Sequence, residues 1–406
     1  MPDKKVSRCY IHIGMHKTGS TAIQKNLAKS KSNPTWNLMQ VGGRANMGPS
    51  LYAMFHDNPQ ELYWFKQRGE TREAVLAKGK VWLNELAQAI EANHDKTCII
   101  SSEFLSGCEE SLILRFKNFL TPFFDEIRVI GYVRAPISYK ISQFQEALKY
   151  FDCEFNMNHI HLNYRSMFEK FDAIFGKNFV TLRKFDPLTF PERCIVKDFC
   201  QQLGIEPPIT ITRNNDGLSR EACGMLYAYR KLGPGYGMGE AALQENNRII
   251  RSLSKIEGDG LKVHHDLMRK DILQMQDDIQ WMESRLNVSL MEREEPDSAK
   301  LIRNENDFLT ISRSSCQAFA THFGKSIQQK IPDEWIPKED PANPADVSNL
   351  LENCRLLARE TNLVKISRLK TDITTKNNRN KFVKRLRRIW KFIDKFKTFN
   401  SQMWLS

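Results

Sequence analysis

The sequence lacks any apolar run that approaches the roughly 20 residues needed to cross a bilayer. Its N-terminal lysines are not followed by the long apolar stretch of a secretion signal. Its nine cysteines form no C-x-x-C pair and no regular spacing, which disfavours a disulfide framework or a zinc site. We therefore expect a cytoplasmic protein with reduced, mostly buried thiols.

The positive charge of the chain is concentrated at one end. The formal net charge is +12, and ten Lys or Arg residues but only one Asp lie between Lys376 and Ser406. Within Lys381–Lys397, apolar residues recur at helical spacing and basic residues fill the other face. This pattern predicts a basic amphipathic helix that either lies on an anionic membrane surface or docks on the body. The near-neutral remainder disfavours nucleic-acid binding.

Strand and helix patterns alternate in the first half of the chain. Apolar runs predict strands at Arg8–Ile13, Thr97–Ser101, Ile127–Val133 and Phe179–Arg183. Helical spacing predicts helices at Val81–Ala92, Ser111–Leu120 and Ile137–Tyr150. This alternation favours an α/β fold with three layers, in which helices flank a P-loop-like parallel sheet and ligands bind at the carboxyl ends of its strands.

The first predicted strand runs through a glycine-bounded loop, GMHKTGST, directly into a helix. Such a junction binds phosphate-like anions, because the helix N-terminus presents unpaired N–H groups and glycine permits close approach. In the nucleotide-binding pattern G-x-x-x-x-G-K-[ST], Gly14, Gly19 and Thr21 fit, but Ser20 stands where the lysine belongs. The only lysine of the loop is Lys17, inside the bend. This departure disfavours ordinary ATP or GTP hydrolysis.

The string Lys17-Thr18-Gly19-Ser20-Thr21 resembles the phosphosulfate-binding loop of the sulfotransferase family, bacterial type. A second motif of that family is a strand that ends in arginine, with a serine eight positions later in a helix. Arg134 and Ser142 match it, although Ala135 departs from the acidic or amide residue that is common before the proline.

The resemblance implies the donor 3′-phosphoadenosine-5′-phosphosulfate and direct in-line transfer to a hydroxyl or amine without a metal. It places the Lys17 loop at the phosphosulfate and Arg134 with Ser142 at the 3′-phosphate. It covers residues 8 to about 235, so we expect a donor-binding catalytic core at 1–235. After this core we expect three further parts: a helical accessory layer at 236–330, a Pro-rich linker at 331–346, and C-terminal helices with the basic tail at 347–406.

Three residues are candidates for the chemistry. The Lys17 ammonium would neutralise charge on the leaving nucleotide phosphate. Glu103, at a strand end, and His16, beside Lys17, are alternative bases for the acceptor proton, and a third alternative is that neither acts. We interpret His12 as a core histidine with its ring fully hydrogen-bonded and His264-His265 as a surface pair.

The acceptor is expected to be a carbohydrate, a glycolipid or a small molecule. Trp36, Tyr63 and Trp64 either stack on its sugar rings or pack in the protein. Two other functions stay open: a P-loop kinase that acts on a small molecule, and a protein that binds nucleotide or nucleic acid without turnover.

Overall fold

The computed structural model describes residues 7–30, 33–151, 154–212, 217–235, 237–292 and 301–374. A five-stranded sheet lies at its centre, with strand order β2-β3-β1-β4-β5 and every pair parallel. The strands are β1 (Arg8–His12), β2 (Trp36–Leu38), β3 (Thr97–Ser101), β4 (Glu126–Val133) and β5 (Val180–Lys184). The predicted parallel sheet is therefore confirmed, and the four predicted strands are found within one residue of their predicted ends.

Both faces of the sheet are buried, which explains the nearly continuous apolar runs in its strands. Side chains alternate between the faces, so Cys9 and Ile11 of β1 pack in one core cluster. On the opposite face, Ile99, Ile130 and Tyr132 pack in another.

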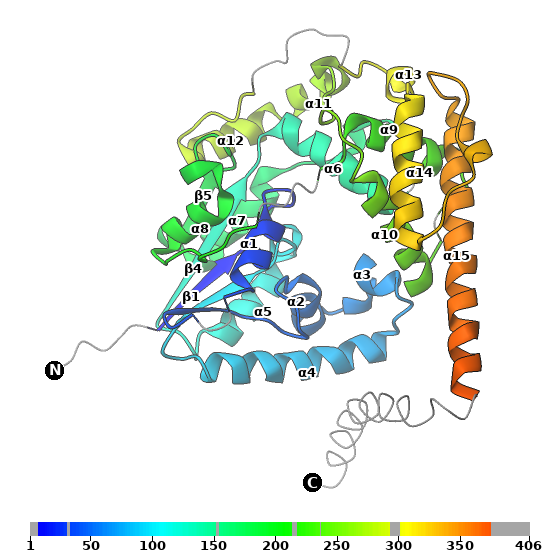
Figure 1. Ribbon diagram of the computed structural model, residues 1–406. Helices are drawn as coiled ribbons and strands as arrows, with labels where there is room; N and C mark the ends of the chain where they lie inside the picture. Colours follow the sequence, from blue (N-terminus) through cyan, green and yellow to red (C-terminus); the bar gives the residue numbers. More distant parts are fainter. Residues whose placement is uncertain are drawn as a thin grey trace, which may run out of the picture.

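Helices cover the two faces and give the predicted three layers (Figure 1). The face that carries Ile99 is covered by α1 (Ser20–Leu27) and α8 (Ile195–Leu203). The other face packs against α2 (Gly48–Phe55), α4 (Arg72–Glu91), α5 (Glu110–Leu120), α7 (Tyr164–Phe175) and α12 (Gln276–Leu286). The short α3 (Tyr63–Lys66) buries Phe65 in a small separate cluster.

A second large core of the described residues, the helical core, contains no strand of the sheet and is built mainly from helices. It gathers residues from α6 (Pro136–Tyr150), α9 (Arg220–Leu232), α10 (Glu240–Leu253), α14 (Arg313–Ile327) and α15 (Pro344–Thr374), with α13 (Glu305–Phe308) contributing Phe308. The helix α11 (Arg269–Gln274) precedes α12. Figure 1 shows α15, in orange, along the edge of this helical part next to α14.

The division of the chain at residues 235, 330 and 346 stays a prediction. Helices α6 and α9 precede residue 235 yet pack with later helices, and α9 lies against α15. Ile331 and Ala342 of the predicted linker are buried in the helical core. The predicted tail helix, Lys381–Lys397, lies outside the described residues.

Two further expectations concern cysteines and membrane spans. The eight cysteines in the described ranges are free and buried, as expected. Within those same ranges, no helix combines the length and the apolar character of a membrane span.

Candidate functional site

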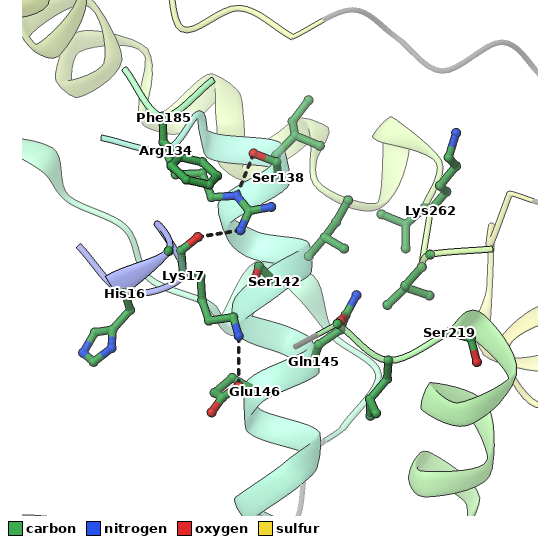
Figure 2. Close-up of a pocket in the computed structure, with 18 of the residues that line it drawn as sticks. His16, Lys17, Arg134, Ser138, Ser142, Gln145, Glu146, Phe185, Ser219 and Lys262 are labelled. Carbon is green, nitrogen blue, oxygen red and sulfur yellow. Dashed lines mark hydrogen bonds and ion pairs between the residues drawn. The ribbon is translucent and has the colours of Figure 1, made fainter. Parts of the chain in front are cut away.

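Two loops meet at the carboxyl edge of the sheet. Because β1 and β4 are neighbours, the loop after β1 and the loop after β4 lie side by side, and the segment after β3 flanks them. They form one wall of a cavity of about 900 Å³ (Figure 2). The cavity is lined by all the predicted site residues except Thr18: His16, Lys17, Gly19, Ser20, Thr21, Glu103, Arg134 and Ser142.

The loop after β1 is a tight bend held by glycines and by its own hydrogen bonds. Gly14 and Gly19 have left-handed φ angles of +79° and +80°, and Lys17 shares that region with φ 65°. A β-carbon on Gly14 would lie 2.8 Å from the Cα of Glu103, so only glycine lets the two segments pack this closely. The buried Thr18 donates its hydroxyl to the Met15 carbonyl at 2.6 Å. The sequence thus folds this loop around the point where α1 begins.

The side chain of Ser20 indicates whether this loop fits an anionic ligand. It is the first residue of α1, it is 2% exposed, and it lines the cavity. Among the described residues its Oγ has no hydrogen-bond partner. Buried hydroxyls are normally paired, so the loop fits a ligand that accepts a hydrogen bond there.

Lys17 is paired with the carboxylate of Glu146, which no motif of the sequence indicates. Its Nζ lies 3.1 Å from Oε2 of Glu146, which is also 3.3 Å from the ammonium of Lys149. Burial pushes the pKa of Glu146 up, but the two lysines outweigh burial and lower this pKa below its usual value. Glu146 follows Ser142 by four residues, so helical spacing alone would have placed both on one face of α6.

Arg134 ties the two loops together. Its Nη1 donates to the Lys17 carbonyl at 2.7 Å, and its Nε donates to Ser138 Oγ at 3.2 Å (Figure 2). Burial lowers the pKa of Arg134, while the nearby carboxylate of Glu292 acts in the opposite direction. Ser142, one turn after Ser138 on α6, is 9% exposed and faces the same cavity. The structure therefore places both halves of the second motif beside the first.

The two candidate bases lie together. Nδ1 of His16 is 4.0 Å from Oε1 of Glu103, and the side-chain amide of Asn46 donates to that same oxygen at 3.4 Å. Both candidates line the cavity with Lys17. His12 is separate: it is fully buried, its Nδ1 is 2.8 Å from Ser101 Oγ, and burial lowers its pKa to about 3. The prediction of a core histidine is confirmed, but the expectation that its ring is fully hydrogen-bonded is not, because Nε2 has no partner among the described residues.

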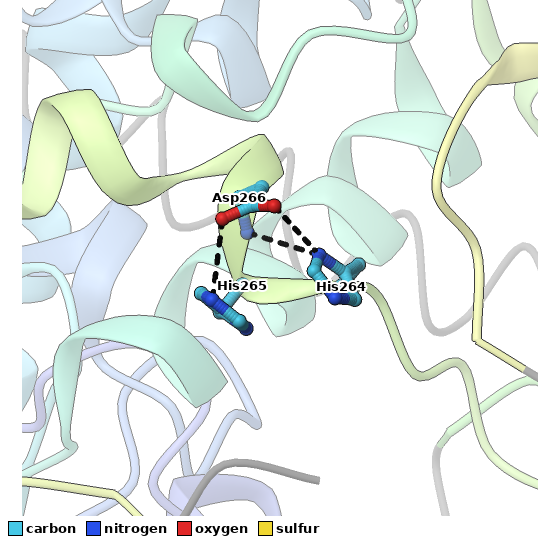
Figure 3. A group of neighbouring side chains, drawn as sticks. All are labelled: His264, His265 and Asp266. Carbon is cyan, nitrogen blue, oxygen red and sulfur yellow. Dashed lines mark hydrogen bonds and ion pairs between the residues drawn. The ribbon is translucent and has the colours of Figure 1, made fainter. Parts of the chain in front are cut away.

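The far wall of the cavity comes from the helical half of the molecule and includes Ser219, Lys262, His264 and His265. The expectation of a surface histidine pair is wrong, because both rings are half-buried in this wall. Ligand atoms of the two histidines and of Asp266 lie within 4.8 Å of one another, a spacing at which they could hold a metal ion (Figure 3). Asp266 already interacts with both rings and with Arg269.

The three aromatic candidates for sugar stacking have different surroundings. Trp36 is 1% exposed in β2, so it packs in the core and is not available to an acceptor. The guanidiniums of Arg44 and Arg68 both lie over the ring of Trp64, at 4.1 and 3.9 Å from its centre. Tyr63 is 37% exposed and its ring packs against Phe151.

Two solved sulfotransferase structures are similar to this chain. A sulfotransferase from Alicyclobacillus acidocaldarius is 9% identical with a TM-score of 0.38, and the match covers 69% of this chain and 96% of that one. The sulfotransferase domain of the Synechococcus PCC 7002 olefin synthase is 17% identical with a TM-score of 0.32, covering 53% and 82%. No protein-family model and no curated protein matches the chain. Both TM-scores lie below 0.5, so these matches carry no argument about the function of this chain.

Proposed function

We propose that the protein is a sulfotransferase that moves a sulfuryl group from 3′-phosphoadenosine-5′-phosphosulfate to a hydroxyl or amine. One observation carries the proposal: two potential anion sites, the loop with Lys17 and the loop with Arg134, line one cavity and are joined by the hydrogen bond from Arg134 to the Lys17 carbonyl. The donor is anionic at both ends, so it requires two such sites. A single phosphate cradle would not distinguish this donor from ATP.

The donor fits the residues present. The segment Lys17–Thr21 would hold the phosphosulfate at the N-terminus of α1, where the Ser20 hydroxyl has no partner in the described part of the chain. Arg134 and Ser142 would hold the 3′-phosphate. The cavity volume of about 900 Å³ lies near the upper end of the roughly 300–1,000 Å³ of ligand pockets, which leaves room for an acceptor beside the donor.

The transfer itself is a direct displacement at sulfur. The acceptor oxygen or nitrogen forms a bond to sulfur while the bond from sulfur to the bridging phosphate oxygen breaks, and adenosine 3′,5′-bisphosphate leaves. The Lys17 ammonium would neutralise the charge on that oxygen, which requires it to turn from Glu146. His16 or Glu103 would take the acceptor proton, since both line the same cavity. This chemistry needs no metal.

For the acceptor we propose a carbohydrate, a glycolipid or a small molecule. The tail at Lys381–Lys397 would bring the enzyme to the anionic inner face of a membrane, where each basic residue contributes on the order of 1 kcal/mol. A cytoplasmic enzyme with that peripheral contact is the arrangement that we propose.

Isothermal titration with adenosine 3′,5′-bisphosphate and with ATP tests the donor. We expect the bisphosphate to bind more tightly, and Arg134→Ala to weaken it by about 10- to 150-fold, because hydrogen bonds to charged groups contribute about 1.5–3 kcal/mol. Ser142→Ala should weaken it less, and Ser284→Ala, on the exposed face of α12, should not. Tight binding of ATP without binding of the bisphosphate would favour the kinase alternative.

Transfer of labelled sulfate from the donor to extracts of the native host tests turnover. In that assay Lys17→Met should slow transfer by about 10²–10³-fold. Comparing His16→Gln with Glu103→Gln would then distinguish the three alternatives: a much larger loss in one variant identifies the base, and small losses in both indicate that neither residue acts. Bisphosphate binding without any transfer would instead favour a nucleotide-binding protein without turnover.

A further inference from the structure

A carboxylate from a distant part of the chain occupies the start of α6. Oε2 of Glu292 accepts the N–H of Ile137 at 2.8 Å, and its two oxygens accept the N–H of Ser138 at 3.1 and 3.2 Å. The N-cap residue, Ala135, has no side chain that could accept these bonds. Glu292 therefore caps a helix of 15 residues from more than 150 residues away, and it does so inside the cavity.

Glu292 is held in this position by its neighbours. Leu290 is fully buried in the core beside the sheet, and its N–H donates to Glu283 Oε1 at 2.6 Å. Lys184, at the end of β5, donates its ammonium to the Ser289 carbonyl at 2.8 Å. These contacts hold the segment Ser289–Glu292 at the carboxyl edge of the sheet, so the fold itself places the Glu292 carboxylate there.

The charge of Glu292 acts on Arg134, the residue proposed above to hold the 3′-phosphate of the donor. The hydrogen-bond acceptors of Arg134 are a carbonyl and a hydroxyl, both neutral. Glu292 acts on Arg134 as a negative charge that opposes the effect of burial on its pKa. A helix N-terminus also favours negative charge. Glu292 thus interacts with both features of this loop that would attract a phosphate, the charge of Arg134 and the N-terminus of α6.

We propose that Glu292 is an internal competitor of the 3′-phosphate of the donor. Its carboxylate holds the start of α6 beside Arg134 when no donor is bound, and it withdraws when the 3′-phosphate approaches Arg134 and Ser142. The proposal rests on the sulfotransferase function proposed above. Its consequence is a weaker complex with the bisphosphate product, because part of the binding free energy is used to displace the carboxylate.

Titration of Glu292→Gln with adenosine 3′,5′-bisphosphate tests the competition. Glutamine keeps an acceptor oxygen for Ile137 and Ser138 but removes the charge. We expect affinity for the bisphosphate to rise about ten-fold. Two unit charges about 10 Å apart near a protein surface repel each other by on the order of 1.5 kcal/mol, which corresponds to that change in affinity. Affinity for adenosine 5′-monophosphate, which lacks the 3′-phosphate, should change less than two-fold. Glu257→Gln removes a charge from the far wall of the same cavity and serves as the matched control.

The outcomes separate the two proposals. If the wild type binds the bisphosphate but Glu292→Gln binds it no more tightly, or if the gain is equal for the monophosphate, the competition is refuted. An equal gain in Glu257→Gln would also refute it, because any cavity charge would then suffice. If neither protein binds the bisphosphate, the proposed function fails as well. Glu292→Ala, which removes both the charge and the cap, should also tighten binding while lowering the melting temperature.

Discussion

Replacing Gly14 by alanine should destabilise the protein more than the same change at Gly43. Both residues have left-handed φ angles, +79° and +72°, so each variant carries backbone strain of about 1 kcal/mol. A β-carbon on Gly14 would lie 2.8 Å from the Cα and 3.2 Å from the carbonyl oxygen of Glu103, whereas one on Gly43 would meet nothing within 4 Å. Backbone atoms cannot rotate away, so Gly14→Ala carries a further overpacking cost of about 1–3 kcal/mol.

Guanidinium unfolding followed by intrinsic fluorescence measures the difference. The free energy of unfolding should fall by about 2–4 kcal/mol in Gly14→Ala and by about 1 kcal/mol in Gly43→Ala. Gly14→Ala should also weaken binding of the bisphosphate, because relief of the contact moves Glu103 away from the loop that carries Lys17. Equal losses of stability in the two variants would refute the close packing of these segments.

Three further predictions concern a buried carboxylate, a buried histidine and the tail. Asp198→Ala should lower the free energy of unfolding, measured in urea, by roughly 3 kcal/mol. The buried carboxylate of Asp198 accepts hydrogen bonds from Tyr132 at 2.7 Å and from Arg183 at 2.8 and 3.1 Å. A loss below about 1 kcal/mol would contradict this. Burial lowers the pKa of His12 to about 3, so between about pH 6.5 and pH 3 only the unfolded chain binds this proton. As the pH is lowered through this range, the free energy of unfolding should fall by up to about 1.4 kcal/mol per pH unit. His12→Asn should reduce that slope, and a slope no different from that of the exposed-site variant His94→Asn would count against the argument. Truncation after Thr374 should abolish flotation with anionic vesicles, and unchanged flotation would refute the membrane proposal.

The sheet could be predicted because its strands are buried on both faces and therefore read as apolar runs. β2 was missed because three residues, Trp36–Leu38, are too short to form such a run. The helix predicted at Val81–Ala92 begins nine residues earlier, at Arg72, where most side chains are exposed and the apolar spacing is sparse. Its start is marked instead by Thr71, whose hydroxyl accepts the N–H of Ala74.

The site was predictable only where its signals are local. The Lys17 loop and the pair Arg134 and Ser142 follow their strands directly, so the order of elements brings them together. Glu292 gives no such signal, because its role depends on contacts with residues more than 150 positions away. Contacts over that separation are set by tertiary packing, which periodicity and short motifs do not encode.

Helix α6 connects the donor cavity with the helical core. One side of it carries Ser138, Ser142 and Glu146 into the cavity, while Phe144 and Leu148 on another side are fully buried in the helical core. A ligand that shifts α6 would therefore also change how α6 packs against α9 and α10. A fragment cut at residue 235 would lose Phe308, against which Phe144 packs, so we expect the donor pocket and the helical core to melt as one cooperative unit.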